Sequence, residues 1–220
     1  MSSPAETSQQ QPTPPPQHTG FDPVEFWYLH KTKIIGLTIL FVVALVGYTA
    51  YELTQRSARE AANKAFAEAK TADDYKKVIA DHPDQIAAGN AQLKLAELYR
   101  NEGKYDEAIA VLRTFTEKHP AHPLIAGGWL GLGQNAEAAG KIDEALTQYQ
   151  KILTTFPTSY AAPFALLSQG RLQKAKGQND AAKRTFEQVI SQYKMTFFEF
   201  EAKRELDALN KAPKPPVESK

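Results

Sequence analysis

The sequence contains no cysteine, and its formal net charge at pH 7 is only +1. The missing cysteine excludes disulfides, thiolate catalysis, zinc sites with cysteine ligands and lipid attachment through cysteine. It leaves the redox compartment open, because a cysteine-free chain suits either. The near-zero net charge provides no basic field for nucleic acid and no acidic field for a basic partner. We therefore expect no nucleic-acid binding.

Catalytic and cofactor motifs are also missing or out of place. The stretch GLGQNA at Gly131–Ala136 fits a phosphate-binding fingerprint, which needs a preceding strand, but we expect it inside a helix. His119 and His122 straddle an expected helix end with no third metal ligand nearby. We interpret the acidic pairs at expected helix starts as caps rather than acid–base pairs: Asp73/Asp74, Asp106/Glu107 and Asp143/Glu144. We expect no enzyme, no cofactor, no metal and no small-molecule substrate.

Both ends of the chain are rich in proline and polar residues. Residues 1–25 and residues 210–220 are predicted to be disordered tails, because they cannot bury enough apolar surface to offset chain entropy. Pro12–Pro15 in the first tail fits a PxxP ligand, and its two interpretations are a spacer and a docking motif.

One apolar run of 18 residues, Ile34–Tyr51, carries no charge. As a helix it would be roughly 27 Å long, close to the thickness of bilayer hydrocarbon. Aromatic rings at both ends match the two lipid–water interfaces: Trp27, Tyr28, Tyr48 and Tyr51. We predict a transmembrane helix with interfacial flanks at residues 26–53, in which Ile34, Leu40, Val46 and Tyr51 lie in the membrane.

Two other interpretations of the run are weighed against this one. A cleaved signal peptide is the stronger, although the region before the run is long and the best cleavage site is only Gly47–Thr49. A buried core helix is the weaker, because nothing else in the chain is apolar enough to surround it. Flanking charge does not settle the orientation, since Lys31 and Lys33 are balanced by basic residues after the run.

The rest of the chain repeats itself every 37 residues. GKYDEAIAVL begins at Gly103 and GKIDEALTQY at Gly140, and a third glycine follows at Gly177. Pro83, Pro120 and Pro157 keep the same spacing. A fixed period of this length indicates a repeat array. Each repeat is predicted to hold two helices joined at the glycine and ended by the proline.

The residues at fixed positions resemble the tetratricopeptide repeat (TPR). The best copy has Trp129, Leu132, Gly133, Ala145 and Tyr149, whereas the first has Gln92 at the tryptophan position. The resemblance implies an all-α chain in which one transmembrane helix precedes a helical solenoid at residues 54–209. We predict a degenerate repeat at 54–84, repeats at 85–121, 122–158 and 159–195, and a closing helix at 197–209, which would cover the last apolar face.

A solenoid of this kind binds proteins along the concave face formed by the first helix of each repeat. The resemblance maps ligand-facing positions onto seven polar residues: Glu97, Arg100, Asn101, Gln134, Glu137, Arg171 and Lys174. We predict that this face binds protein or peptide partners, as a scaffold. Ordinary solvated helix positions are the competing interpretation of each residue.

The order of anchor and array resembles the bacterial ancillary SecYEG translocon subunit family. The resemblance implies a single-pass protein of the bacterial inner membrane, with a cytoplasmic N-terminus and periplasmic repeats that contact the Sec translocon and periplasmic chaperones. The Pro/Gln-rich start departs from that family. The repeats are also similar to those of the periplasmic cell-division coordinator of the Tol-Pal system, which would require a cleaved signal peptide. A cytoplasmic location of the repeats is a further alternative.

Overall fold

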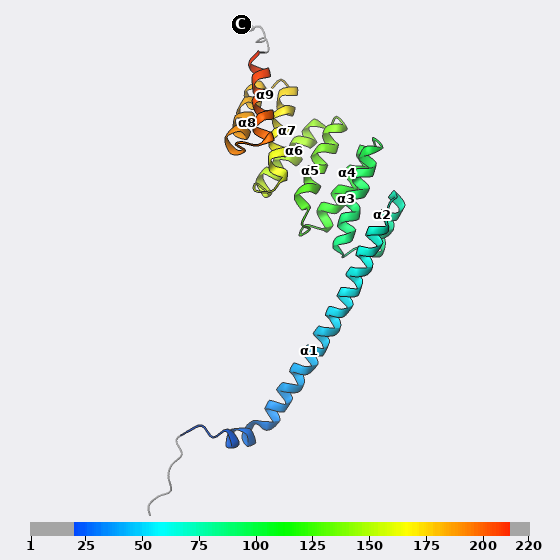
Figure 1. Cartoon of the computed structure of the whole chain (residues 1–220), viewed down its shortest axis with the longest axis vertical. Coiled ribbons are helices and arrows are strands. Elements are labelled where there is room, and N and C mark those ends of the chain that lie inside the picture. Colours follow the sequence, from blue (N-terminus) through cyan, green and yellow to red (C-terminus); the bar gives the residue numbers. More distant parts are fainter. Residues whose placement is uncertain (1–19, 212–220) are drawn as a thin grey trace, which may run out of the picture. The chain divides into compact units, whose positions relative to one another are not determined.

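The structure, a computed structural model, describes residues 20–211, and every regular element within that range is an α-helix. This confirms the predicted all-α class. Figure 1 shows the helices in chain order: α1 (Pro23–Glu68), α2 (Ala72–Asp81), α3 (Ile86–Asn101), α4 (Tyr105–Lys118), α5 (Ile125–Ala138), α6 (Ile142–Thr155), α7 (Ala161–Ala175), α8 (Asn179–Gln192) and α9 (Phe197–Lys211). The PxxP stretch Pro12–Pro15 lies outside the described residues.

The chain divides after Thr54 into two compact units. The first contains the start of α1, where Asp22 caps the helix: its Oδ1 accepts from the backbone N–H of Val24 at 2.8 Å. Pro23 occupies the first helical position, where its missing N–H costs nothing. The apolar side chains that follow are exposed, and no residue of the run is buried. Within residues 20–211, α1 is the one candidate membrane span by length and composition.

The second unit opens with the last turns of α1, α2 and α3. Ala62 of α1 is fully buried with Val78, Ala87 and Ala91, and Phe66 packs against this cluster. Thr71 forms the predicted capping box of α2, because its hydroxyl accepts from the N–H of Asp74 while the Asp74 carboxylate accepts from the N–H of Thr71. The residues before the first repeat therefore belong to the packed array.

Three helix pairs follow: α3–α4, α5–α6 and α7–α8, each turning at a glycine. Gly103, Gly140 and Gly177 have φ angles of 73°, 74° and 72°. At Gly103 the next N–H, of Lys104, donates back to the carbonyl of Tyr99 at 2.8 Å, and the same bond recurs at the other two turns. This is a Schellman motif, whose left-handed residue is strained with any side chain. The repeated glycines thus mark the turn inside each pair, as predicted.

Within each pair a small residue on the first helix meets a large one on the second. A Cβ at Gly133 would collide with the ring of Tyr149, and a Cβ at Gly170 with the ring of Phe186. Both rings are fully buried. In the first pair the equivalent residues are Ala96, the smallest residue after glycine, and Leu112, and both are buried in the same cluster. These contacts set the distance between the paired helices and fill the core.

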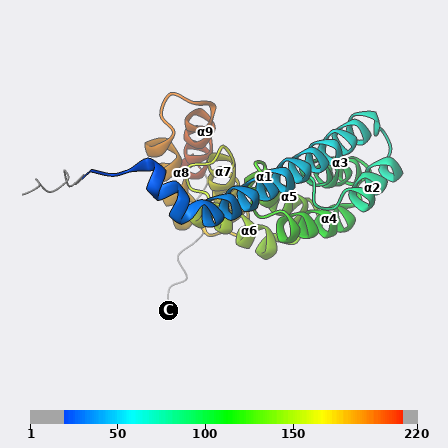
Figure 2. The same ribbon diagram turned by 90° about the horizontal axis from the view of Figure 1, so that it is seen from below.

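Consecutive helices from α2 to α9 pack against one another along the array (Figure 2). The array ends with α9, whose Ala202 and Leu209 are buried with Leu166 and Phe186. The connection into α9 passes through Met195, a non-glycine residue at φ 59°. The predicted closing helix is present and extends to Lys211.

Candidate protein-binding surface

The first helices of the repeats approach one another more closely than the second helices do. α7 contacts both α5 and α9, whereas no comparable contact joins α4 to α6 or α6 to α8 in residues 20–211. The side formed by α3, α5, α7 and α9 is therefore the tighter side of the array, and we call it the inner face. α3 and α5 are the pair on this face that lacks a close mutual contact.

The seven polar residues predicted to bind partners lie on α3, α5 and α7, and six of them occupy two equivalent positions. Glu97, Gln134 and Arg171 are separated by steps of 37 residues. The second set, one turn further along each helix, is Arg100, Glu137 and Lys174. Asn101 is exposed at the end of α3. The three repeats thus place a different combination of polar side chains at the same two sites.

Glu97, Arg100 and Gln134 come together at the junction of α3 and α5, where they line a cavity of about 190 Å³. We call this cavity the polar pocket. Its lining comes from three helices: Leu93, Ala96, Glu97 and Arg100 of α3, Leu112 of α4, and Gly127, Gly131, Gln134 and Asn135 of α5. Leu112 is buried and gives the pocket an apolar wall.

Two residues that line the polar pocket each have one buried polar atom without a hydrogen-bond partner: Nη1 of Arg100 and Oδ1 of Asn135. Asn135 is only 3% exposed, and its amide nitrogen donates to the carbonyl of Gly131 at 2.8 Å. A buried polar atom without a partner is costly and unusual in a folded protein. The pocket therefore offers one charged donor and one acceptor to an incoming group.

Sequence reasoning did not select Asn135. A signal was available, because Asn135 is a polar residue on the buried side of a helix that is otherwise lined with alanine, glycine and leucine. Residues of this kind need a partner when they are buried.

In the middle pair, α5–α6, the charged inner-face residue Glu137 is bound by a residue of the same pair. The hydroxyl of Tyr149 donates to the carboxylate of Glu137 at 2.7 Å. Burial, and then the neighbouring Glu137 carboxylate, raise the pKa of Tyr149 well above its ordinary value. Glu137 thus joins α5 to α6, and the tyrosine stays protonated as a donor.

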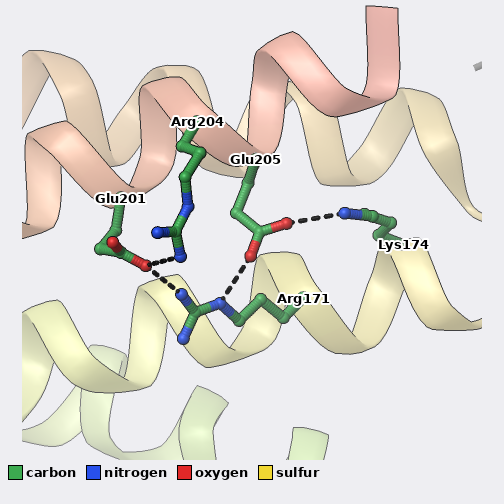
Figure 3. A network of polar contacts seen from close by, with 5 residues as sticks. All are labelled: Arg171, Lys174, Glu201, Arg204 and Glu205. Atoms are coloured by element: carbon green, nitrogen blue, oxygen red, sulfur yellow. Dashed lines mark hydrogen bonds and ion pairs between the residues drawn. The ribbon is translucent and has the colours of Figure 1, made fainter. Parts of the chain in front are cut away.

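The last junction, between α7 and α9, is closed by ion pairs (Figure 3). Arg171 reaches Glu201 at 2.7 Å and Glu205 at 2.9 Å, and Lys174 reaches Glu205 at 2.7 Å. Arg204 adds a second bond to Glu201 at 2.7 Å. Burial would raise the pKa of Glu205, but hydrogen bonds from Lys174 and Arg171 outweigh it and lower that pKa.

The open and closed junctions differ at one pair of positions. Two steps of 37 residues lead from Gly127 to Glu201 and from Gly131 to Glu205. At the first junction the helix facing Arg100 therefore has glycines, whereas at the last junction it has the two carboxylates that hold Arg171 and Lys174. Gly127 and Gly131 line the polar pocket. The hydroxyl of Tyr160 occupies the place of a Cβ at Gly127, and a Cβ at Gly131 would approach Leu112 to 3.0 Å.

The other motifs weighed in the sequence have structural roles. The acidic pairs lie in the first turns of α2, α4 and α6 as predicted, but Asp74 alone among them completes a cap; α4 and α6 have no side-chain cap. Asp106 instead pairs with Lys141, and Asp143 with Lys176, both in the following repeat. This corrects the interpretation of those two pairs as caps. The acids extend toward the next repeat because its turn lysines offer a full positive charge.

His122 is buried and accepts a hydrogen bond from the N–H of Leu124 through Nδ1, while its Nε2 lies 3.3 Å from the carbonyl of Ile86. Both ring nitrogens are thus engaged, Nδ1 within its own repeat and Nε2 with the preceding one. Residues 20–211 contain no cluster of three or more potential metal ligands. Gly131–Ala136 lies inside α5, so no strand precedes the GLGQNA stretch.

Comparison with known proteins identifies the repeat type. Residues 93–160 and residues 164–194 match two models of the tetratricopeptide repeat. No curated protein matches the chain. The TPR-like repeats of a Podosopora anserina protein described as a candidate kinesin light chain share 19% identity with it, at a TM-score of 0.52, over 70% of this chain and 84% of that one. A single-substitution variant of that protein gives the same values. The predicted TPR repeats are confirmed. The likeness to the solved structure concerns the fold alone.

Proposed function

We propose that this chain is a membrane-anchored TPR scaffold that binds protein partners at the polar pocket, without catalysis of its own. The observation that carries the proposal is the pair of buried, unpartnered atoms, Arg100 Nη1 and Asn135 Oδ1, in one pocket. Such atoms are satisfied when a partner brings a complementary acceptor and donor. A polypeptide offers both.

The chain itself indicates the chemistry of the partner. At the α7–α9 junction the positions equivalent to Glu97 and Arg100 hold cations that bind the carboxylates of α9. At the α3–α5 junction the guanidinium of Arg100 is present and the facing carboxylates are absent. We propose that a partner supplies an acidic group to Arg100 while an apolar side chain packs on Leu93 and Leu112. Glu97 and Gln134 then contact the flanks of the bound segment.

Partner contact by Asn101, Glu137, Arg171 and Lys174 stays a prediction. The first of these is exposed and available. For Arg171 and Lys174, a partner would have to replace the carboxylates of Glu201 and Glu205, which already satisfy them. We therefore place the primary contact at Arg100.

We propose that α1 anchors the chain in the bacterial inner membrane, with the N-terminus in the cytoplasm and the repeats in the periplasm. The support is the uncharged run of α1, whose side chains are exposed and whose ends bear aromatic rings. The proposed partners are the Sec translocon and periplasmic chaperones, because an anchor followed by degenerate TPRs resembles the ancillary translocon subunit. A periplasmic Tol-Pal-type coordinator is the alternative.

The membrane part is tested by sequencing the N-terminus of the mature protein and by protease treatment of intact and permeabilised cells. An intact N-terminus, with repeats cleaved once the outer membrane is permeabilised, supports the proposal. A mature chain that begins after Tyr48 would favour the coordinator alternative. Repeats that stay protected until the inner membrane is opened would place the array in the cytoplasm.

The binding part is tested in cells by placing a photoreactive amino acid at Gln134 of the full chain. We expect discrete crosslinked partners that decrease at least tenfold in Arg100→Gln, since a charged hydrogen bond is lost. Glu117→Gln, an exposed position on α4, serves as the control and should leave the crosslinks unchanged. Crosslinks that persist equally in Arg100→Gln would exclude the polar pocket as the binding site.

A further inference from the structure

A second pocket lies between α2, α3 and α4, and it shares no residue with the polar pocket. It measures about 230 Å³ and is lined by Lys76, Ile79, Gln92, Leu95, Val111 and Thr114. We call it the Gln92 pocket. Its walls are mainly apolar, and it is larger than the roughly 150 Å³ cavity that holds a benzene ring.

Gln92 lines this pocket and has one polar atom without a partner. The residue is 3% exposed, and its Oε1 is buried without a hydrogen-bond partner. A carbonyl oxygen in that position can only accept, so the pocket favours an occupant that combines an apolar body with one donor.

The next repeat shows what fills the equivalent space. One step of 37 residues leads from Gln92 to Trp129, from Leu95 to Leu132 and from Thr114 to Lys151. The indole ring of Trp129 packs against the core there, and Nζ of Lys151 lies 5.7 Å from the ring centroid. In the first repeat the ring is missing, while Leu95 and the second-helix position at Thr114 remain as walls.

We propose that the Gln92 pocket receives the indole side chain of a tryptophan from a protein partner. The ring would take the place that Trp129 occupies one repeat later, and its N–H would donate to Oε1 of Gln92. Tryptophan carries only a donor on a large apolar ring, which matches an acceptor among Ile79, Leu95 and Val111. Lys76 at the margin adds a cation near the ring, as Lys151 does for Trp129. This site does not depend on the polar pocket or on its partner.

The test uses the full chain in lipid nanodiscs and the peptide acetyl-Gly-Trp-Gly-amide, with empty nanodiscs as background. Two matched peptides carry 1-methyltryptophan, which lacks the N–H, or leucine. We expect saturable binding of the tryptophan peptide, about fivefold stronger than binding of the methylated peptide. The preference should disappear in Gln92→Leu, which keeps the side-chain size and loses the acceptor. Arg100→Gln should leave it unchanged.

A second variant fills the pocket from within. Gln92→Trp should raise the melting temperature by roughly 2–4 °C, because it buries an aromatic ring and removes an unpaired acceptor, and it should abolish peptide binding. The proposal is overturned if the wild-type chain shows no preference for the N–H, if the preference persists in Gln92→Leu, or if folded Gln92→Trp binds the peptide as the wild type does.

Discussion

The two ends of the inner face have the same helix arrangement but different side-chain contacts. At the α3–α5 junction Arg100, Gly127 and Gly131 line the polar pocket, and no carboxylate pairs with the guanidinium. At the α7–α9 junction Arg171 and Lys174 face Glu201 and Glu205, and the result is a set of ion pairs (Figure 3). The helix pairs themselves are alike at both ends, since each turns at a left-handed glycine.

The difference shows how a repeat array separates stability from binding. The fold is fixed by small and large residues that every repeat keeps, whereas the inner-face position differs between repeats, as Glu97, Gln134 and Arg171 show. A cation that meets glycine on the next helix is available to a partner, and a cation that meets a carboxylate holds the array together. Each of the following changes tests one side of this contrast.

The largest effect should come from the packing that both ends share. Tyr149→Ala and Phe186→Ala each remove a fully buried ring that packs on a glycine. We expect each to lower the free energy of unfolding by about 3–5 kcal/mol. Urea denaturation of the full chain in micelles, followed by far-UV circular dichroism, measures the loss. A loss confined to one of the two variants would show that the repeats are not equivalent in packing.

A smaller effect should distinguish the closed junction from the open one. The Glu201 side chain is 7% exposed and holds both Arg171 and Arg204, so Glu201→Gln should cost about 2 kcal/mol. Glu97→Gln is the matched change at the open junction, where the carboxylate is exposed and pairs with Lys94. There we expect about 0.5 kcal/mol or less.

Hydrogen exchange of the α9 amides provides the local measurement for that pair of variants. Glu201→Gln should accelerate exchange in α9, since local opening follows local stability. Glu97→Gln should leave α9 unchanged. Equal effects of the two variants on α9 would contradict the assignment of the ion pairs to closure of the array.

The α7–α9 junction and the end of α4, where His119 lies, should lose stability in different pH ranges. The pKa of Glu205 is lowered from 4.5, so its contribution is complete above that pH and is lost as the pH falls through the lowered pKa. Burial, and then His122, lower the pKa of His119 from 6.5, so its loss begins below pH 6.5, where the unfolded chain gains a proton first. Glu205→Gln should flatten the stability curve below pH 4.5, and His119→Gln should flatten it just below pH 6.5. Melting temperatures across both ranges supply the check.

The smallest effect should come from the ion pairs between successive turns. Lys141 pairs with Asp106 at 2.6 Å, and the Asp106 carboxylate is largely exposed. Lys141→Ala should lower the free energy of unfolding only slightly, and less at high salt, because solvent screens an exposed pair. Lys176→Ala, the corresponding change at Asp143, should behave alike. A larger loss in either variant would mean that the pair is shielded from solvent in a way its exposure does not show.

The architecture of the array could be predicted from the sequence, because glycine and proline determine the backbone conformation of their immediate neighbours. A left-handed turn at Gly140 and a capping box at Thr71 depend on residues a few positions away. The 37-residue period then predicts the same turn at the equivalent position of each repeat. This is why the helix pairs and the closing helix could be predicted.

The sequence did not predict in the same way which charged residues of the inner face are paired within the chain. Arg100 and Lys174 occupy equivalent positions, and the sequence around each gives no sign of its partner, since Glu205 lies 31 residues beyond Lys174. Continuing the 37-residue register into α9 would have aligned Glu201 with Gly127 and Glu205 with Gly131. The signal was therefore present, but it required reading the closing helix as a modified first helix.

The two unfilled pockets could not be predicted either, because they also depend on residues far apart in the sequence. Gln92 was recognised as a departure from the aromatic position, but whether a neighbouring side chain fills the space depends on three helices at once. Asn135 likewise became significant only when its Oδ1 was found without a partner. Cavities and unpaired atoms belong to packing, and a period in the sequence does not encode them.

The carboxylates of α9 have a consequence for how this gene can change in length. They pair with α7 alone among the first helices, so the end of the array is specified by the final repeat and is indifferent to the number of repeats before it. An ancestral or engineered gene that duplicates residues 85–121 or 122–158 in frame would keep its terminus intact. The glycine turns, spaced by 37 residues, would fall back into register. Natural variation in length is thus expected upstream of α7, while the last repeat and α9 are inherited as one block.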